Sequence, residues 1–203
     1  MLAWALRFIL LVAALLMVMA WPRHLATSGA VGATLIVVVA FLAVLAAVLL
    51  LSYAIAQANA GERPAGVRAL SFAGIAGEYA ALVLFYVFIQ PFERLWMGSD
   101  AVGRLKPGDV PVLLVHGYMC NRGYWWWFRA RLRERGHAVA TITLESPITG
   151  IEELADNLDR RIADLLEETG ARQVALVTHS MGGLVARAMM RRHGDARVAR
   201  FIT

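Results

Sequence analysis

One serine, Ser180, ends an apolar run and precedes a glycine pair, in the sequence "THSMGG". A serine hydroxyl becomes a nucleophile only when a base takes its proton and donors stabilise the oxyanion that forms. A sharp turn from a strand into a helix exposes such a hydroxyl if the residues two before and two after it are small. Gly182 meets this requirement, whereas Thr178 stands where the usual motif has glycine. We therefore predict that Ser180 is a nucleophile on a tight turn.

Two backbone N–H groups are candidate donors to the oxyanion. Met181 directly follows the serine at the expected start of a helix. His116 and Gly117 end another apolar run, "VPVLLVHG", and a glycine there permits a sharp turn. We expect the N–H groups of Met181 and of Tyr118, the residue after this glycine, to face the oxyanion together.

The elements that must position these residues alternate between strands and helices. Short apolar runs predict buried strands at 110–116, 137–144, 172–178 and 198–203. Helices are predicted at 124–136, 151–170 and 182–194, each closed by a glycine. The second helix has one apolar face, made of Ile151, Leu154, Leu158, Ile162, Leu165 and Leu166. Such alternation indicates βαβ units, that is, a parallel sheet with helices on both faces.

The two motifs "VHGYMCNRGYW" and "HSMGG", in this order and about 60 residues apart, carry a family resemblance. Residues 110–203 resemble the α/β-hydrolase fold, and bacterial triacylglycerol lipases and esterases in particular. The resemblance implies that Ser180 is the nucleophile and that Tyr118 and Met181 form the oxyanion hole. It implies no cofactor and no metal. The residues expected to support the turn and the loop are His116, Gly117, His179 and Gly182.

The catalytic acid and base of this family are not found in the sequence. In the family they follow the nucleophile in the order Ser, acid, His. His193 is the only histidine after Ser180, at the far end of the predicted helix, and Asp195 comes too early for the acid. His116 and His179 are interpreted as structural. We expect a C-terminally truncated enzyme rather than a short inactive product, because the run at 198–203 would leave an exposed sheet edge.

Residues 1–92 differ in composition from the rest of the chain. They contain four basic and two acidic residues, whereas residues 93–203 contain 16 basic and 13 acidic ones. The whole chain is 59% hydrophobic, compared with roughly 45–50% in soluble domains. We therefore predict a transmembrane helical region at 1–92, a linker at 93–109, and the N-terminal part of an α/β-hydrolase domain at 110–203.

Three apolar segments of the first region approach the roughly 20 residues that a membrane helix needs. They are 4–20, 31–51 and 70–90. The first is either an uncleaved helix, which we favour, or a signal sequence with a cleavage site after Ala20. Glu78 interrupts the third, either as a functional carboxylate inside the bilayer or, as we prefer, at its interface. The basic residues of the loops do not decide the orientation of the chain.

Other conspicuous residues have simpler explanations. Cys120 is the only cysteine, which excludes an internal disulfide, and it is interpreted as a small loop residue. The aromatic run at 124–128 fits an acyl-binding entrance, a membrane surface or the packing of a helix on the sheet. Four arginines are interpreted as a solvated surface rather than a lipid-binding face: Arg129, Arg131, Arg133 and Arg135.

Together these features predict a membrane-anchored serine hydrolase that cleaves a carboxylic ester, such as a lipid, through an acyl-enzyme at Ser180. The expected location is a bacterial cell membrane that the chain crosses several times. The net charge is +5, split as +2 and +3 between residues 1–92 and 93–203, which does not suggest a nucleic-acid partner. Two alternatives stay open: a membrane scaffold or transport-associated protein whose hydrolase-like domain does not cleave, and an acyltransferase on the same fold.

Overall fold

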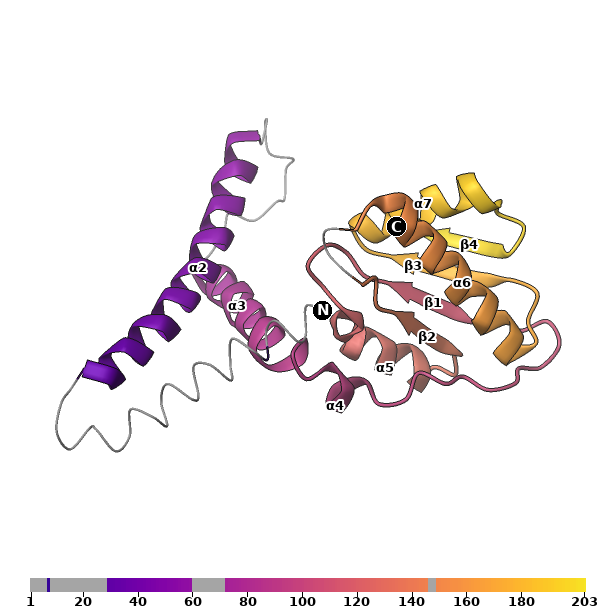
Figure 1. The fold of residues 1–203 in the computed structure, drawn as a ribbon, viewed down its shortest axis with the longest axis horizontal. Helices are drawn as coiled ribbons and strands as arrows, with labels where there is room; N and C mark the ends of the chain where they lie inside the picture. The colour runs from indigo at the N-terminus through magenta and orange to yellow at the C-terminus, as the bar shows by residue number, and fades with distance from the viewer. Residues whose placement is uncertain (1–6, 8–28, 60–71, 146–148) are drawn as a thin grey trace. The chain divides into compact units, whose positions relative to one another are not determined.

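A computed structural model of the chain describes residue 7 and residues 29–59, 72–145 and 149–203. The chain divides into two compact units, of which one covers Leu6–Phe88 and the other covers Ile89–Thr203. The described part of the first unit consists of apolar helices, and the second contains a parallel sheet with its covering helices (Figure 1).

The helices of the first unit are α2 (Gly29–Asn59) and α3 (Phe72–Val83), which continues as the π-helix η2 (Leu84–Ile89). The hydroxyl of Tyr79 donates to the carbonyl of Leu42 at 3.0 Å and so joins α3 to α2. Many of their apolar side chains are exposed. These helices therefore present apolar surface outward.

Two helices of the described residues are long and apolar enough to cross a membrane, Val38–Asn59 and Phe72–Ile89. The predicted spans at 31–51 and 70–90 correspond to them. The predicted span at 4–20 lies outside the described residues, apart from Arg7. Of the roughly three predicted helices of this kind, two are present in the part of the chain that the structure describes.

The sheet of the second unit has four strands, β1 (Val112–Val115), β2 (Val139–Ile142), β3 (Val174–Thr178) and β4 (Val198–Ile202). All pairs are parallel and the strand order is β2-β1-β3-β4. The predicted parallel sheet is thus confirmed, with each strand inside its predicted run. β1 and β3 lie in the centre, and β2 and β4 form the edges.

Helices cover both faces of this sheet, as predicted (Figure 1). The chain passes from β1 to β2 in one direction along the sheet and from β2 to β3 and β4 in the other. Right-handed crossovers therefore place α5 (Trp126–Glu134) on one face of the sheet. They place α6 (Ile151–Thr169) and α7 (Met181–His193) on the other face. Alternate residues of β1 divide between the two faces. Leu113 and Val115 pack in the core under α6 and α7, whereas Leu114 packs with Trp125 in the core on the α5 side.

The apolar face of α6 agrees with the sequence pattern except at its first residue. Leu154, Leu158, Ile162 and Leu165 are fully buried in the core. Ile151, which was predicted to share this face, is 39% exposed because it opens the helix beyond the edge of the core. The helix ends at Gly170, whose φ of 73° is a left-handed conformation that favours glycine.

Residues 93–109, which were predicted to be a linker, pack against the second unit instead. They begin with the short helix α4 (Glu93–Met97). The carboxylate of Asp100 accepts the backbone N–H of Thr141 on the edge strand β2 at 2.8 Å. Further along, the N–H of Leu105 donates to the carbonyl of Thr169 at the end of α6 at 3.0 Å. The sheet-containing unit therefore begins at Ile89, and the predicted boundaries at 92 and 109 are not those of the structure.

Candidate active site

The two sequence motifs follow strands that are neighbours in the sheet. β1 and β3 are parallel, and Val115 pairs with Thr178. The residues that follow both strands therefore emerge side by side at the carboxyl end of the sheet. The chain leaves β1 toward β2 on one side and leaves β3 toward β4 on the other. Open α/β sheets bind ligands at the carboxyl ends of their strands where the direction of winding reverses in this way. The candidate site lies at this reversal point.

Ser180 joins β3 to α7 in a backbone conformation that few residues other than glycine adopt, with φ 52° and ψ −122°. Such a conformation costs about 1–3 kcal/mol and persists only where the surroundings impose it. Here the N–H of His179 donates to the carbonyl of Val115 at 3.0 Å. The N–H of Gly183 donates to the carbonyl of Ser180 itself at 2.9 Å. The serine is exposed, so the strained turn presents it to solvent.

Close packing explains one glycine of each motif, Gly182 and Gly117. A Cβ on Gly182 would lie 2.6 Å from the carbonyl oxygen of His116, because the first turn of α7 starts directly against the end of β1. A Cβ on Gly117 would lie 3.0 Å from the Cβ of Ser180. The loop after β1 therefore lies against the serine, and the structure brings the two motifs into contact.

Thr178, which departs from the usual glycine of the motif, is accommodated by β4. Its side chain is buried, and its hydroxyl donates to the carbonyl of Ile202 at 3.1 Å. The side chain is therefore directed toward the neighbouring strand. The threonine also ties the start of the turn to the end of β4.

The two predicted oxyanion donors follow directly after residues that touch each other. Tyr118 comes after Gly117, and Met181 comes after Ser180 as the first residue of α7. Met119 has a φ of 53°, so the chain turns sharply just after Tyr118. Tyr118 is 54% exposed. Both residues follow strands that end side by side, and their role as donors remains a prediction.

His116 is a buried, neutral histidine with both ring nitrogens in use. Its Nδ1–H donates to the carbonyl of Gly117 at 2.8 Å, and its Nε2 accepts the N–H of Leu144 at 3.0 Å. Burial lowers the pKa of His116 to about 4, against the hydrogen bond to the Gly117 carbonyl, which raises it. This imidazole shapes the loop after β1 and has no nitrogen left to take a proton from a substrate or a serine.

His179, the residue before the serine, stacks on an aromatic ring of the neighbouring segment. Its ring and that of Tyr124 lie 4.7 Å apart between centroids and 22° apart in orientation. Tyr124 belongs to the 3₁₀-helix η3 (Arg122–Trp125), which follows the loop after β1. The stacking therefore links the turn at Ser180 to the far end of that loop.

None of the four histidines in the described part of the chain donates to or accepts from the Ser180 side chain. His193 is at the opposite end of α7, a helix of 13 residues that spans about 20 Å. Its Nε2 is 2.7 Å from the carboxylate of Asp156 on α6. His137 precedes β2 and so lies at the amino end of the strands, opposite the candidate site. Among the described residues, no histidine is therefore hydrogen-bonded to Ser180 as a base would be.

Residues 112–202 match a family model described as "Alpha/beta hydrolase family". These residues form a partial α/β-hydrolase fold. Among solved structures, the mature Bacillus licheniformis lipase BlEst2 is 23% identical with a TM-score of 0.44, over 50% of this chain and 42% of that one. An extracellular α/β-hydrolase from a Paenibacillus species is 21% identical with a TM-score of 0.38, over 45% of this chain and 38% of that one. No curated protein sequence matches the chain.

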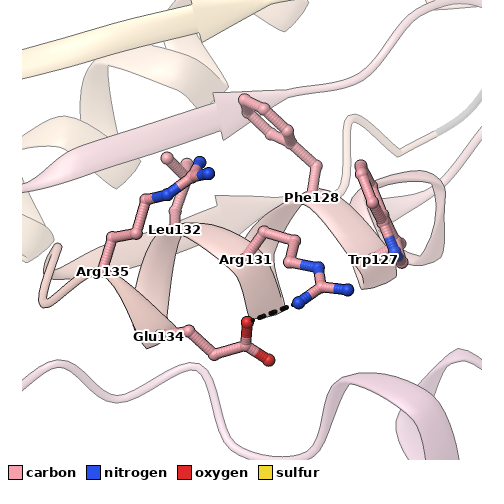
Figure 2. A pocket seen from close by; sticks show the side chains of 6 residues that line it. All are labelled: Trp127, Phe128, Arg131, Leu132, Glu134 and Arg135. Carbon is pink, nitrogen blue, oxygen red and sulfur yellow. Dashed lines mark hydrogen bonds and ion pairs between the residues drawn. The ribbon is translucent and has the colours of Figure 1, made fainter.

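The partial hydrolase fold has a concave region on α5, which shares no residue with the candidate site. It has a volume of about 320 Å³ and is lined by residues of α5 and of its C-terminal end: Trp127, Phe128, Arg131, Leu132, Glu134 and Arg135 (Figure 2). Arg131 pairs with Glu134 at 2.9 Å. The depression is a surface feature of one helix and offers no group that could activate the serine.

The four arginines of this helix do not form one solvated surface. Arg129 is buried, and its guanidinium lies 3.0 Å from the carboxylate of Asp100. Arg133 donates to the carbonyl of Val139 at 3.1 Å. Only Arg131 and Arg135, one turn apart, reach the depression. The prediction was wrong for Arg129 because its partner Asp100 comes from the segment predicted to be a linker.

Cys120 lies in the loop after β1 but is not poised as a nucleophile. Burial raises the pKa of its thiol to about 11, so it is protonated at neutral pH. Across residues 29–59, 72–145 and 149–203, no three His, Cys, Asp or Glu side chains gather in a way that could hold a metal ion.

Two residues that sequence reasoning missed support the site. Gln90 and Asn121 are both almost fully buried, and two hydrogen bonds, each between the side chain of one and the backbone of the other, join them across 31 positions of the chain. Gln90 was assigned to the apolar first region, and Asn121 to an unremarked loop position. No spacing or composition signal connects them, so only the folded structure could reveal the pair.

Proposed function

We propose that this chain carries the nucleophile and the oxyanion hole of a membrane-anchored serine hydrolase that acts on carboxylic esters. One observation carries the proposal: Ser180 is held with φ 52° between β3 and α7, at the point where the winding of the sheet reverses. A strained serine at this position is the arrangement that exposes a nucleophile in α/β-hydrolases.

In the proposed reaction, the hydroxyl oxygen of Ser180 attacks the ester carbonyl carbon while a base takes its proton. The carbonyl oxygen becomes an oxyanion, which the N–H groups of Tyr118 and Met181 stabilise. The bond to the alkoxy oxygen then breaks, the alcohol leaves with the proton from the base, and water releases the acid from the acyl-enzyme. The base and its orienting acid are supplied by residues outside those described.

The membrane anchor is the second part of the proposal. Val38–Asn59 and Phe72–Ile89 have the length and composition of membrane spans. Because their side chains are largely exposed, a bilayer would remove their apolar surface from water. We expect the protein to stay in the membrane pellet after extraction with alkaline carbonate. Release into the supernatant would disprove the anchor without bearing on the serine.

The test of the catalytic proposal is covalent labelling with a fluorophosphonate probe in membranes from cells that express the intact protein. We expect the intact protein without substitutions, called the parent below, to be labelled and its Ser180→Ala variant to be unlabelled. Ser52→Ala is the matched control, since Ser52 is an exposed serine of α2 whose hydroxyl donates to the carbonyl of Val48 in the same helix. Absence of labelling in the parent would overturn the hydrolase and favour a scaffold that binds without cleaving.

A further inference from the structure

Two buried amides tie the loop after β1 to the residue at which the chain leaves η2. Gln90 and Asn121 are 1% and 2% exposed, although amide side chains are mostly found at protein surfaces. The backbone N–H of Asn121 donates to Oε1 of Gln90 at 3.0 Å. The side-chain Nδ2 of Asn121 donates to the backbone carbonyl of Gln90 at 2.8 Å. We call these two hydrogen bonds the amide clamp.

The remaining polar atom of the Asn121 side chain is also in use. Its Oδ1 accepts the N–H of Gly123 at 2.9 Å and so caps the start of η3. The surroundings leave little room for another arrangement, because a Cβ on Gly123 would lie 3.3 Å from the Cβ of Glu93. Asn121 is therefore held in one orientation by the segment that contains Gln90.

The amide clamp forms one end of a short loop whose other end rests on the serine. Gly117 packs against Ser180, with 3.0 Å from its would-be Cβ to the Cβ of the serine. Three residues separate Gly117 from Asn121, and Tyr118 is the first of them. A loop this short, fixed at both ends, has few conformations open to it. The position of the Tyr118 N–H therefore depends on where Gln90 holds Asn121.

We infer that Gln90 is a positioning residue, which acts through Asn121 to hold the oxyanion donor Tyr118 in place. This inference rests on the proposed serine hydrolase. It also makes the start of the sheet-containing unit part of the site, because Gln90 directly follows Ile89, which is fully buried in that unit.

The expected consequence of losing the clamp is slower chemistry rather than weaker binding. Removing Oε1 of Gln90 leaves a buried N–H of Asn121 without an acceptor, which is costly enough to displace the loop. A displacement of this kind misplaces a donor that has to meet the developing oxyanion, and misplacement by about 1 Å can cost on the order of 100-fold in rate. The second bond of the clamp uses the Gln90 backbone and survives, so we expect roughly a 10- to 100-fold loss.

The experiment compares Gln90→Met, which keeps the length of the side chain without its acceptor, with Gln90→Glu, which keeps an acceptor oxygen. The intact protein is labelled with a fluorophosphonate at several probe concentrations, to separate the maximal rate from the half-saturating concentration. We expect Gln90→Met to lower the maximal rate 10- to 100-fold with a half-saturating concentration within twofold of the parent. Gln90→Glu should recover most of the rate.

A control variant separates positioning from loss of stability. Thr141→Val removes a buried hydroxyl of the edge strand β2, away from the loop after β1. This hydroxyl donates to the carboxylate of Asp100. The variant should lower the melting temperature as Gln90→Met does but leave the maximal labelling rate of the folded protein unchanged. Equal rates for Gln90→Met and Thr141→Val would overturn the inference.

Hydrogen exchange provides a readout that does not need an active serine. Peptides covering 117–121 should exchange faster in Gln90→Met and in Asn121→Asp, which loses the Nδ2 donor, while peptides of α6 stay as in the parent. If the parent is not labelled at all, the proposed hydrolase fails, and exchange alone decides about the clamp. Unchanged exchange at 117–121 in both variants would overturn it, even if one variant folds poorly.

Discussion

Two turns meet at the carboxyl edge of the sheet, and they are held in different ways. The turn from β3 into α7 is closed by its own backbone, as in the bond from the N–H of Gly182 to the carbonyl of His179 at 3.0 Å. The loop after β1 is held by a residue 31 positions earlier in the chain, Gln90. The turn at Ser180 thus has backbone bonds of its own besides its contacts with β1, whereas the loop after β1 depends on a residue of a distant segment.

This difference shows in the residues that each turn requires. The turn at Ser180 needs small residues and a strained serine, which a short sequence motif can specify. The loop needs Gln90, Asn121 and the buried His116, whose partners come from different segments. A protein can therefore keep the motif around the serine and still lose the second donor. The predictions below test this contrast, from the largest expected effect to the smallest.

The largest effect on stability is expected for Gly182→Ala in the turn. The added methyl would meet backbone oxygens at 2.6 and 2.7 Å, which cannot rotate away. We expect a loss of about 3 kcal/mol of unfolding free energy, although alanine favours a helix by about 1 kcal/mol. Gly183→Ala is the matched control, because its methyl meets the hydroxyl of Thr203, a side chain that can turn. Thermal unfolding in detergent should show a larger loss of stability for Gly182→Ala than for Gly183→Ala. Equal losses would contradict the close approach of Gly182 to the backbone at the end of β1.

The loop should respond to acid through His116, whose pKa is lowered to about 4 by burial. An ordinary histidine titrates near 6.5, so the unfolded chain binds the proton first. Stability is therefore full above about pH 6.5 and falls as the pH drops toward about 4, by about 3 kcal/mol at most. His116→Gln can accept the Leu144 N–H without titrating, and it should show a smaller loss across this range. Parallel curves for both proteins would contradict a neutral buried His116.

A smaller effect is expected where the turn is tied to β4. Thr178→Val keeps the shape of the side chain but removes the hydroxyl that bonds Ile202. We expect a loss of about 1 kcal/mol and a fluorophosphonate labelling rate close to that of the parent, because the turn closes through its backbone. A large fall in labelling without a fall in melting temperature would show that the threonine acts on the serine itself.

The smallest effect is expected at the surface depression on α5. Arg131→Ala removes an exposed ion pair with Glu134, and such pairs contribute about 0.5 kcal/mol or less. Neither the melting temperature nor the labelling of Ser180 should change measurably, since the depression shares no residue with either turn. A clear loss of labelling would show that this depression does communicate with the site.

Much of the second unit could be predicted from its sequence. Apolar runs located all four strands, and the glycines at 136, 170 and 194 located the ends of the helices. The need for a small residue at 182 was also predicted, from the steric limits around a serine on a tight turn, although the atoms that a Cβ there would meet belong to the end of β1. The burial of Arg129 was not predictable, because its charge is matched by Asp100, which precedes it by 29 positions and belongs to a stretch with no apolar period.

What the sequence by itself determined is the set of local requirements: apolar runs long enough for strands, a serine followed two residues later by a glycine, and apolar segments of membrane length. The tertiary structure alone decided that β1 lies beside β3, which brings Gly117 against Ser180. It alone also decided that Gln90 reaches Asn121. The physical reason is that local patterns report which surfaces must be buried, whereas the choice of partner depends on how all the elements pack at once.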